Sequence, residues 1–486
     1  MTNHHIPDIL RFLAFAILNV IFGYNRVRFT TDYKLYGWLT IANGGVCLLL
    51  APRTNLFSTL LRIPGPVLLT YHRYVGFATI LHATIHWGAT AAHYVRTNQL
   101  AATLGSTFTR WGLVSWACLM IIALTALPRI VRRKSFELFY YAHFFFLLFV
   151  IGACLHAKHS PEFLLPGLGL WVLDRAVRFA YNFRTVTPLS VVHYPGGVTK
   201  FKLEGVQVTR PNQMAWVQLP GVSFLNWHPF TIASAPGDSH ATIAIRGLGG
   251  FTNKVQGLAL DAHSCHGGNE KSGGAVTSAV LIPRQQVKIR VDGPYGHGGL
   301  LWEQYPVVVL VAGGIGITPA ISIASHIVRR ASSAASCDRS PAVRGQGWHV
   351  HLLWAIKDIQ HAQWFEEEMT ELARVIAETN APVTLDISIF ASGSGRRKAG
   401  LGSEEESMAG GGAVEQGYAF RGPATVYEGR PDVLGWMSDV KERRRGLDAA
   451  VSLCGPRPLI DGARKAAARV SGDMGLFHVE EEVFEF

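Results

Sequence analysis

Three histidines occupy one apolar stretch, YHRYVGFATILHATIHW at residues 71–87. An ionisable side chain is costly inside a bilayer, so histidines in a membrane-length segment indicate a functional site. His72 and His86 are 14 positions apart, which at about 1.5 Å and about 100° per residue places them about 21 Å apart on nearly one helix face. His82, four residues before His86, is interpreted as a packing or hydrogen-bonding residue. The spacing therefore predicts two sites stacked along one helix.

A second apolar segment, FYYAHFFFLLFVIGACLHAKHS, carries His143 and His156 at a similar spacing. We predict that His72 faces His143 and that His86 faces His156. Both axial positions of haem iron accept neutral imidazole, so two b-type haems are the expected occupants. Zinc is the rival metal, but no cysteine or carboxylate accompanies the pairs. On an ideal helix His143 and His156 lie about 140° apart, so a π-bulge or a tilted haem is also expected.

These histidines need membrane helices to position them, and the first part of the chain is apolar enough to supply six. A bilayer requires roughly 17–25 residues per helix. The candidate spans are 9–24, 35–52, 66–91, 111–128, 136–157 and 161–181. The N-terminus lacks the features of a cleaved signal peptide, so the first span is expected to remain as an anchor.

Basic residues set the expected orientation. Arginines and lysines concentrate near 53–62, 129–134 and 175–184, which fall on one side of the predicted bundle and mark the cytoplasmic face. The basic segment YNRVRFTTDYK would lie outside and contradicts this rule. The formal net charge of +11 is attributed to basic residues beside the spans, which anionic lipids attract, and not to a nucleic-acid-binding surface. Six cysteines without CxxC spacing indicate reduced thiols.

After residue 183 the chain has the pattern of a water-soluble protein. Short strands separated by turn residues predict a small β-barrel up to about residue 300. A buried strand, a glycine-rich turn and a helix follow at 307–328, which is how a phosphate-binding helix N-terminus is built. The turn lacks GxGxxG spacing and alone also suits a structural turn.

The order of HPFTIAS, GGFT, DGPYG, AGGIGITP, YEGRP and LCGPRP looks like the ferredoxin NADP reductase type of flavin module. Joined to spans with paired histidines, it resembles the ferric reductase and NADPH oxidase superfamily, in particular its ferric-chelate reductase branch. The resemblance implies three domains: an all-α six-helix transmembrane haem bundle at 1–183, an FAD-binding β-barrel at 184–300 and an NADPH-binding α/β domain at 301–486.

The resemblance also implies site residues. Those beside the flavin are His228, Pro229, Phe230 and Thr231, and those at its ribityl chain and diphosphate are Arg246, Gly250 and Thr252. The NADPH diphosphate would meet Gly313, Gly314, Gly316, Thr318 and Pro319, while Arg430 would recognise the 2′-phosphate. The nicotinamide would lie beside Cys454, Gly455 and Pro456, and Phe486 would cover the flavin ring as a gate. The catalytic residues implied are His228, Thr231, Cys454 and Phe486.

The implied activity moves electrons from cytosolic NADPH through FAD and two haems to an external ferric, or also cupric, chelate. The implied location is the plasma membrane, where the lipid bilayer surrounds the spans. The resemblance is also compatible with assembly into a homo-oligomer. A superoxide-producing NADPH oxidase is the nearest alternative. That branch usually has another histidine where this chain has Thr90, and larger outer loops.

A histidine-based proton channel with a redox-sensing nucleotide module is an alternative from another class. Two glycine- and serine-rich insertions, 263–276 and 391–417, are expected to be disordered. Asp292 in DGPYG replaces a common glutamate of the family and is expected to be tolerated.

Overall fold

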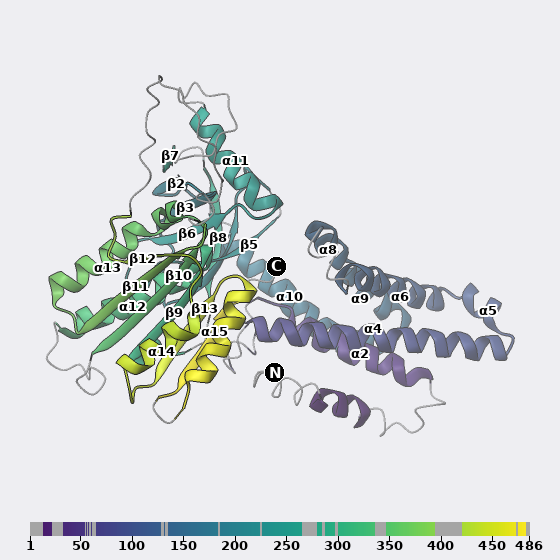
Figure 1. Ribbon diagram of the computed structural model, residues 1–486. Coiled ribbons are helices and arrows are strands. Elements are labelled where there is room, and N and C mark those ends of the chain that lie inside the picture. Colours follow the sequence, from purple (N-terminus) through teal and green to yellow (C-terminus); the bar gives the residue numbers. More distant parts are fainter. Residues whose placement is uncertain are drawn as a thin grey trace, which may run out of the picture. The chain divides into compact units, whose positions relative to one another are not determined.

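The computed structural model divides into two compact units, one ending at Ala180 and the other beginning at Tyr181 (Figure 1). It describes residues 13–21, 33–53, 55, 57, 60, 65–127, 131, 135–182, 185–223, 226–264, 279–283, 287–296, 300–335, 347–393, 420–472 and 475–482. Phe486 and nearly all of both predicted insertions lie outside these residues. The domain boundaries at 183/184 and 300/301 stay predictions.

The first unit is helical. It contains a helix in 13–21, α2 (Tyr33–Leu50), α4 (Gly65–Arg96), α5 (Leu100–Gly105), α6 (Thr107–Ala126), α8 (Phe136–His143), α9 (Phe145–His156) and α10 (Ser160–Asn182). α2 packs along α4, and α6 packs along α9 (Figure 1). α10 approaches α2 through glycines, since a Cβ on Gly45 would collide with the Phe163 carbonyl oxygen. Small residues at such crossings are typical of helices packed in a membrane.

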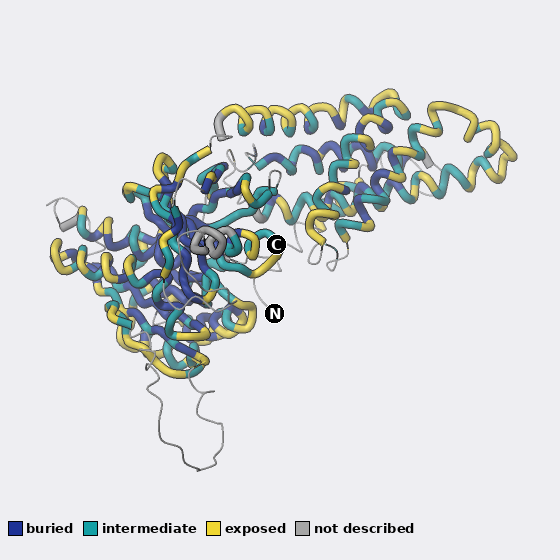
Figure 2. The backbone as a smooth tube through the Cα atoms, turned by 90° about the horizontal axis from the view of Figure 1, so that it is seen from above, coloured by how far each residue is buried: buried dark blue, intermediate teal, exposed yellow. Residues whose placement is uncertain are grey.

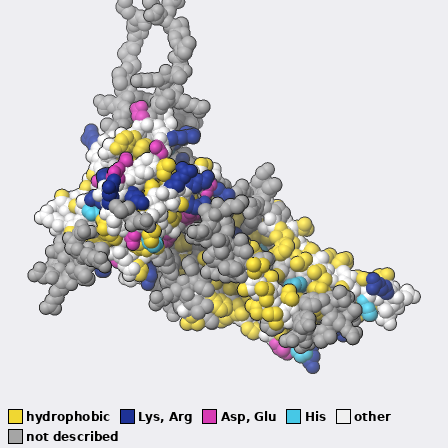
Figure 3. Space-filling model, turned by 60° about the horizontal axis from the view of Figure 1, so that its bottom comes forward, with side chains coloured by type: hydrophobic (Ala, Val, Ile, Leu, Met, Phe, Trp, Pro, Cys, Tyr) yellow, Lys and Arg dark blue, Asp and Glu magenta, His cyan; other side chains and the backbone are white. Residues whose placement is uncertain are grey.

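The helices of the first unit carry large apolar side chains on their outer faces. Leu124, for example, is 72% exposed, and Figure 3 shows hydrophobic side chains gathered over the helical part. Soluble monomers rarely expose large contiguous apolar patches, so this surface suits lipid. By length and composition, two of the described helical segments can cross a membrane, Thr107–Ala126 and Phe136–His156, and Lys34–Leu50 is a shorter apolar helix. The count of six spans remains a prediction.

The second unit begins with two four-stranded antiparallel sheets. One has the order β1 (Thr185–Val186), β8 (Ile289–Tyr295), β4 (Met214–Gln218), β5 (His228–Thr231). The other has the order β6 (Ala241–Arg246), β3 (Val198–Leu203), β2 (Ser190–Tyr194), β7 (Val280–Ile282). Both sheets contribute to one core that includes Phe201, Val217 and Ile243, and a bridge between Ile232 and Ile243 joins them. We call these sheets, with α11 (Gly250–Ser264), the barrel lobe.

The rest of the second unit, the nucleotide lobe, is a six-stranded parallel sheet. Its order is β12 (Thr425–Glu428), β11 (Val383–Ala391), β10 (Trp348–Ile356), β9 (Val307–Gly313), β13 (Ala449–Cys454), β14 (Phe477–Glu482). Helices α12 (Ile317–Ala335) and α13 (Glu366–Thr379) pack on one face, and α14 (Val433–Arg443) and α15 (Arg457–Val470) on the other. Figure 2 shows the buried segments at the centre of this layered arrangement.

The connections of the parallel sheet reverse direction between β9 and β13. From β9 the chain adds β10, β11 and β12 on one side, and then returns to add β13 and β14 on the other. In such sheets the ligand crevice lies at the carboxyl ends of the strands where the order reverses. The fold therefore places a candidate site at the ends of β9 and β13.

Candidate haem and nucleotide sites

The structure brings the four predicted haem histidines together as two pairs. The ring centroids of His72 and His143 lie 6.0 Å apart, and those of His86 and His156 lie 6.4 Å apart. A metal bonds an imidazole nitrogen at about 2.0–2.1 Å, and the ring centre lies about 1.1 Å farther away. Two imidazoles that shared one metal at this bond length would therefore have centroids about 6.2 Å apart. Both pairs fit a shared metal, and their chain order makes α4 parallel to α8 and α9.

The helical segment that carries His143 and His156 is interrupted between them. α8 ends at His143, and α9 begins at Phe145. The N–H of Phe144 donates to the carbonyl of Tyr141, three residues back, at 3.2 Å. This tighter turn changes the phase of the helix between the two histidines. The sequence predicts a π-bulge or a tilted haem, and between the two histidines the structure has a tight turn in place of a π-bulge.

Backbone carbonyls orient one histidine of each pair. Nδ1 of His72 lies 3.0 Å from the Cys47 carbonyl oxygen, and Nδ1 of His156 lies 2.9 Å from that of Phe108. With Nδ1 as the N–H donor, Nε2 is the nitrogen available to a metal, which is the usual arrangement of a ligating histidine. Nδ1 of His143 is buried without a hydrogen-bond partner among the described residues. The residues present therefore fit two bis-histidine haems.

The other histidines of this unit have different contacts. Nδ1 of His82 lies 3.2 Å from the Asn43 amide nitrogen, which in turn donates to Asn19 at 2.7 Å. His159 pairs with Glu162 at 2.9 Å and stacks on Trp38. A polar contact between helices accounts for His82, and a local ion pair and an aromatic stack on α2 account for His159.

The segment predicted to flank the flavin forms β5, which pairs with β4. Pro229 and Phe230 are half-buried there, and Thr231 is buried. The His228 ring stacks on Phe251, with centroids 4.0 Å apart and an interplanar angle of 24°. Phe251 follows Gly250 in the first turn of α11, so this stack holds the start of α11 against β5. Asp292 accepts a hydrogen bond from the Tyr295 hydroxyl within β8.

The residues predicted at the flavin diphosphate surround the same helix start. Thr252 Oγ1 accepts the N–H groups of Leu248 and Gly249, each at 2.9 Å, and so shapes the turn before α11. Arg246, at the end of β6, is half-buried. Burial lowers the pKa of Arg246, and no described carboxylate opposes that effect. A half-buried guanidinium beside a helix N-terminus suits a phosphate group.

The predicted nucleotide residues meet at the crevice between β9 and β13. Gly314 has a left-handed φ of +55°. A Cβ on Gly316 would lie 2.5 Å from the Cys454 carbonyl oxygen, and one on Gly313 would lie 2.5 Å from Pro456 Cδ. Only glycine allows the turn after β9, at Gly313–Gly316, to approach the turn after β13, at Cys454–Pro456, this closely. Gly455 lies in the second turn, and Thr318 and Pro319 are in the first turn of α12.

Arg430 is separate from that cluster. It is exposed and follows β12, which is separated from β9 by two strands, β11 and β10. The N–H of Gly429 donates to the Ala391 carbonyl at 2.9 Å, so Arg430 lies at the carboxyl end of the sheet. It is therefore on the same edge as the crevice.

Three parts of the chain match known protein families. Residues 36–154 match the ferric reductase like transmembrane component, residues 185–298 an FAD-binding domain, and residues 305–468 the ferric reductase NAD binding domain. The chain belongs to the ferric reductase and NADPH oxidase superfamily. This superfamily member thus has a transmembrane ferric reductase domain followed by FAD- and nucleotide-binding domains.

Curated relatives include both kinds of enzyme. Ferric reduction oxidase 7 of Arabidopsis thaliana is 29% identical over 63% of this chain and 40% of its own length. A superoxide-generating NADPH oxidase heavy chain of Dictyostelium discoideum is 26% identical over 75% of this chain and 68% of its own. Mouse NADPH oxidase 1 is 25% identical over 72% of this chain and 62% of its own. The chain thus spans less than half the length of the plant relative.

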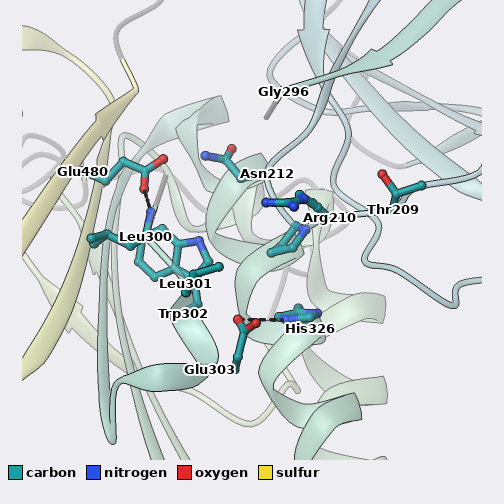
Figure 4. A pocket seen from close by; sticks show the side chains of 11 residues that line it. Thr209, Arg210, Asn212, Gly296, Leu300, Leu301, Trp302, Glu303, His326 and Glu480 are labelled. Atoms are coloured by element: carbon teal, nitrogen blue, oxygen red, sulfur yellow. Dashed lines mark hydrogen bonds and ion pairs between the residues drawn. The ribbon is translucent and has the colours of Figure 1, made fainter. Parts of the chain in front are cut away.

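The superfamily member also has a cavity of about 260 Å³ between its barrel and nucleotide lobes. Figure 4 shows Glu480 accepting the Leu300 N–H, at 2.7 Å, and Glu303 paired with His326, at 3.5 Å. Burial raises the pKa of Glu480. None of these residues belongs to the predicted crevice. Sequence reasoning missed this cavity because its lining comes from distant segments, 209–212, 296, 300–303, 326 and 480.

Proposed function

We propose that this protein is a transmembrane ferric-chelate reductase that moves electrons from NADPH through FAD and two haems to an external metal acceptor. The observation that carries the proposal is the two histidine pairs on parallel membrane-type helices, whose ring centroids lie 6.0 and 6.4 Å apart and would suit two imidazoles on one metal. The FAD- and NAD-binding domains of the same chain support a nucleotide as the electron source. The flavin and haem groups, when bound, supply the conversion of a two-electron hydride into single-electron transfers.

The described residues have distinct roles in this proposal. His72 and His143 hold one haem, and His86 and His156 hold the other. Arg246 binds the flavin diphosphate, and β5 with His228 and Thr231 lies along the flavin ring. The turns at Gly313–Gly316 and Cys454–Pro456 receive the dinucleotide, with Arg430 at its 2′-phosphate. Phe486 lies outside the described residues, and its gating role stays a proposal.

Two features support metal over oxygen as the acceptor. Thr90, four residues after His86, places a buried hydroxyl where the oxidase branch usually has a further histidine. The connection from α4 to α6 contains only residues 97–106, including the short helix α5. A short connection leaves less protein to cover the edge of a haem on that side. We propose that chelated ferric ions, and also cupric ions, react there.

A superoxide-producing oxidase is the second candidate. It is favoured by the coverage of the Dictyostelium relative, which extends over 75% of this chain. We place the FAD and nucleotide domains on the cytoplasmic side of the plasma membrane, following the basic segments near 53–62, 129–134 and 175–184. The acceptor is then external.

The deciding experiment supplies NADPH on the cytoplasmic side of sealed vesicles that contain the full chain. Ferrous iron and superoxide are followed on the other side, with and without superoxide dismutase and oxygen. Iron reduction that is unaffected by dismutase or by removal of oxygen supports the reductase. If iron reduction disappears with either treatment, superoxide is the product and the oxidase replaces our proposal.

A pair of variants tests the assignment of the outer haem in the same vesicles. His86→Leu should remove about one haem per chain and stop external reduction, while NADPH still reduces the flavin. His82→Leu is the matched control, since it removes an imidazole from the same helix but outside both pairs. Full haem content in His86→Leu contradicts the assignment.

A further inference from the structure

Trp364 lies where the nucleotide lobe meets the barrel lobe. It is fully buried, at the end of a 3₁₀ segment (Ile359–Trp364) that precedes α13. Its indole Nε1 donates to the carbonyl oxygen of Pro195, at the tip of the β2–β3 hairpin, at 2.7 Å. A Cβ on Gly196 in that hairpin would lie 3.0 Å from Trp364 Cζ2. The indole is therefore held by the hairpin of the other lobe.

The same indole contacts the arginine assigned to the flavin diphosphate. The Cζ atom of Arg246 lies 5.3 Å from the centroid of the Trp364 ring, within the range of a cation–π contact. The Arg246 Nη1 atom also lies 3.0 Å from where a Cβ on Gly314 would be. Arg246 thus extends from the barrel lobe to two parts of the nucleotide lobe. Its position depends on both lobes being together.

His361 completes the cluster. Its ring stacks on Trp364, with centroids 4.5 Å apart and an interplanar angle of 19°. Burial, together with the charge of Arg246, lowers the pKa of His361 to about 4. His361 is therefore neutral at physiological pH, and it adds no second positive charge beside Arg246.

We propose that Trp364 of the nucleotide lobe is a positioning residue for Arg246, so that the FAD diphosphate site is completed across the lobe interface. The proposal rests on the proposed role of Arg246 in binding FAD. A long arginine side chain loses much conformational freedom when it binds a phosphate, and an aromatic face that already orients it reduces that loss. FAD consequently binds more tightly when the two lobes are docked, and bound FAD in turn favours docking.

The test measures FAD affinity of the full-length protein in detergent, by flavin fluorescence titration. Trp364→Leu should weaken FAD binding by about 5- to 30-fold, the range expected for a desolvated cation–π contact. Trp364→Phe keeps an aromatic face but loses the Nε1 donor, and it should restore most of the affinity. Riboflavin, which has no phosphate, is the second probe, and its binding should be the same in all three proteins.

A double-mutant cycle separates positioning from general damage. In an Arg246→Gln background, Trp364→Leu should cause no further loss of FAD affinity. Trp348→Leu is the matched control, because Trp348 is also buried and hydrogen-bonded in the nucleotide lobe, at the other end of β10. It should leave FAD affinity unchanged.

The failures of the two proposals are distinguishable. If Trp364→Leu weakens FAD equally with and without Arg246, or weakens riboflavin as much as FAD, Trp364 is only structural and the inference is wrong. If Arg246→Gln weakens FAD but Trp364→Leu does not, the inference alone is overturned. If Arg246→Gln leaves FAD affinity unchanged, the assignment of Arg246 fails, and the inference fails with it.

Discussion

Gly112 on α6 lies directly against the His156 ring, and its substitution tests the outer haem site without touching a ligand. A Cβ at this position would lie 2.7 Å from Nδ1 and 2.8 Å from Cε1 of His156, whereas ordinary contacts begin at 3.4 Å. In Gly112→Ala the ring must therefore move away from α6 by about 0.7 Å. Phe108, whose carbonyl accepts from His156 Nδ1 at 2.9 Å, is also on α6. The shift stretches that bond beyond the limit of a hydrogen bond, at about 3.5 Å.

Loss of such an orienting bond weakens metal binding by about 10- to 100-fold. We therefore expect Gly112→Ala to have an outer haem affinity about 10- to 100-fold lower, and to be purified with closer to one haem than two per chain. The assay is haem titration of the purified protein, followed by the absorbance of the reduced haem band. Alanine favours a helix over glycine by about 0.5–1 kcal/mol, so thermal stability of the haem-free protein should not fall through propensity.

Gly88→Ala is the matched control. Gly88 is on α4, two residues after His86, and a Cβ there would have no heavy atom of another residue within 4 Å. This variant should keep both haems. The reasoning is refuted if Gly112→Ala keeps both haems at unchanged affinity, or if Gly88→Ala loses haem to the same extent.

Three further predictions concern the second unit. Arg430→Ala should weaken the binding of NADPH by about 1.5–3 kcal/mol, because a charge-assisted contact with the 2′-phosphate is lost. The binding of NADH should hardly change, and the KM for each cofactor measures both effects. Equal losses for the two cofactors would contradict the assignment. Lys200→Met should lower the free energy of unfolding by about 3 kcal/mol, because it leaves Glu368 of the other lobe without its buried partner. Lys202→Met removes a more exposed ion pair, so it should change the free energy of unfolding by under about 1 kcal/mol. Urea unfolding of both variants measures the difference. Burial lowers the pKa of His361 from 6.5 to about 4 in the folded protein. Between these pH values the unfolded chain therefore binds more protons than the folded protein. The stability that His361 contributes is thus present above pH 6.5 and is lost as the pH falls toward 4. His361→Gln should show a flatter fall in thermal midpoint over that range than the wild type, and parallel curves would contradict the prediction.

Much of the architecture could be predicted from the sequence because the signals are local. The strand, glycine turn and helix at 307–328 correspond to β9 and α12, since hydrophobic runs and glycines act on neighbouring residues. The pairing of His72 with His143 and of His86 with His156 could also be inferred, because helical rise converts sequence spacing into depth.

Contacts between distant segments were decided only by the tertiary structure. A break at Phe144 separates the two histidines of the second segment, yet the sequence there is a continuous apolar run with no glycine or proline to mark an interruption. The closeness of Gly112 to His156 likewise depends on how α6 packs against α9.

The same holds for the interface of the second unit. Lys200 and Glu368 are 168 positions apart, and Trp364 meets both Pro195 and Arg246 from another lobe. No periodicity relates these residues, because their proximity follows from the docking of two separately formed sheets. The sequence by itself therefore determined which histidines, arginines and glycines each segment carries. The packing of segments that are distant in the chain decided which of these residues come into contact.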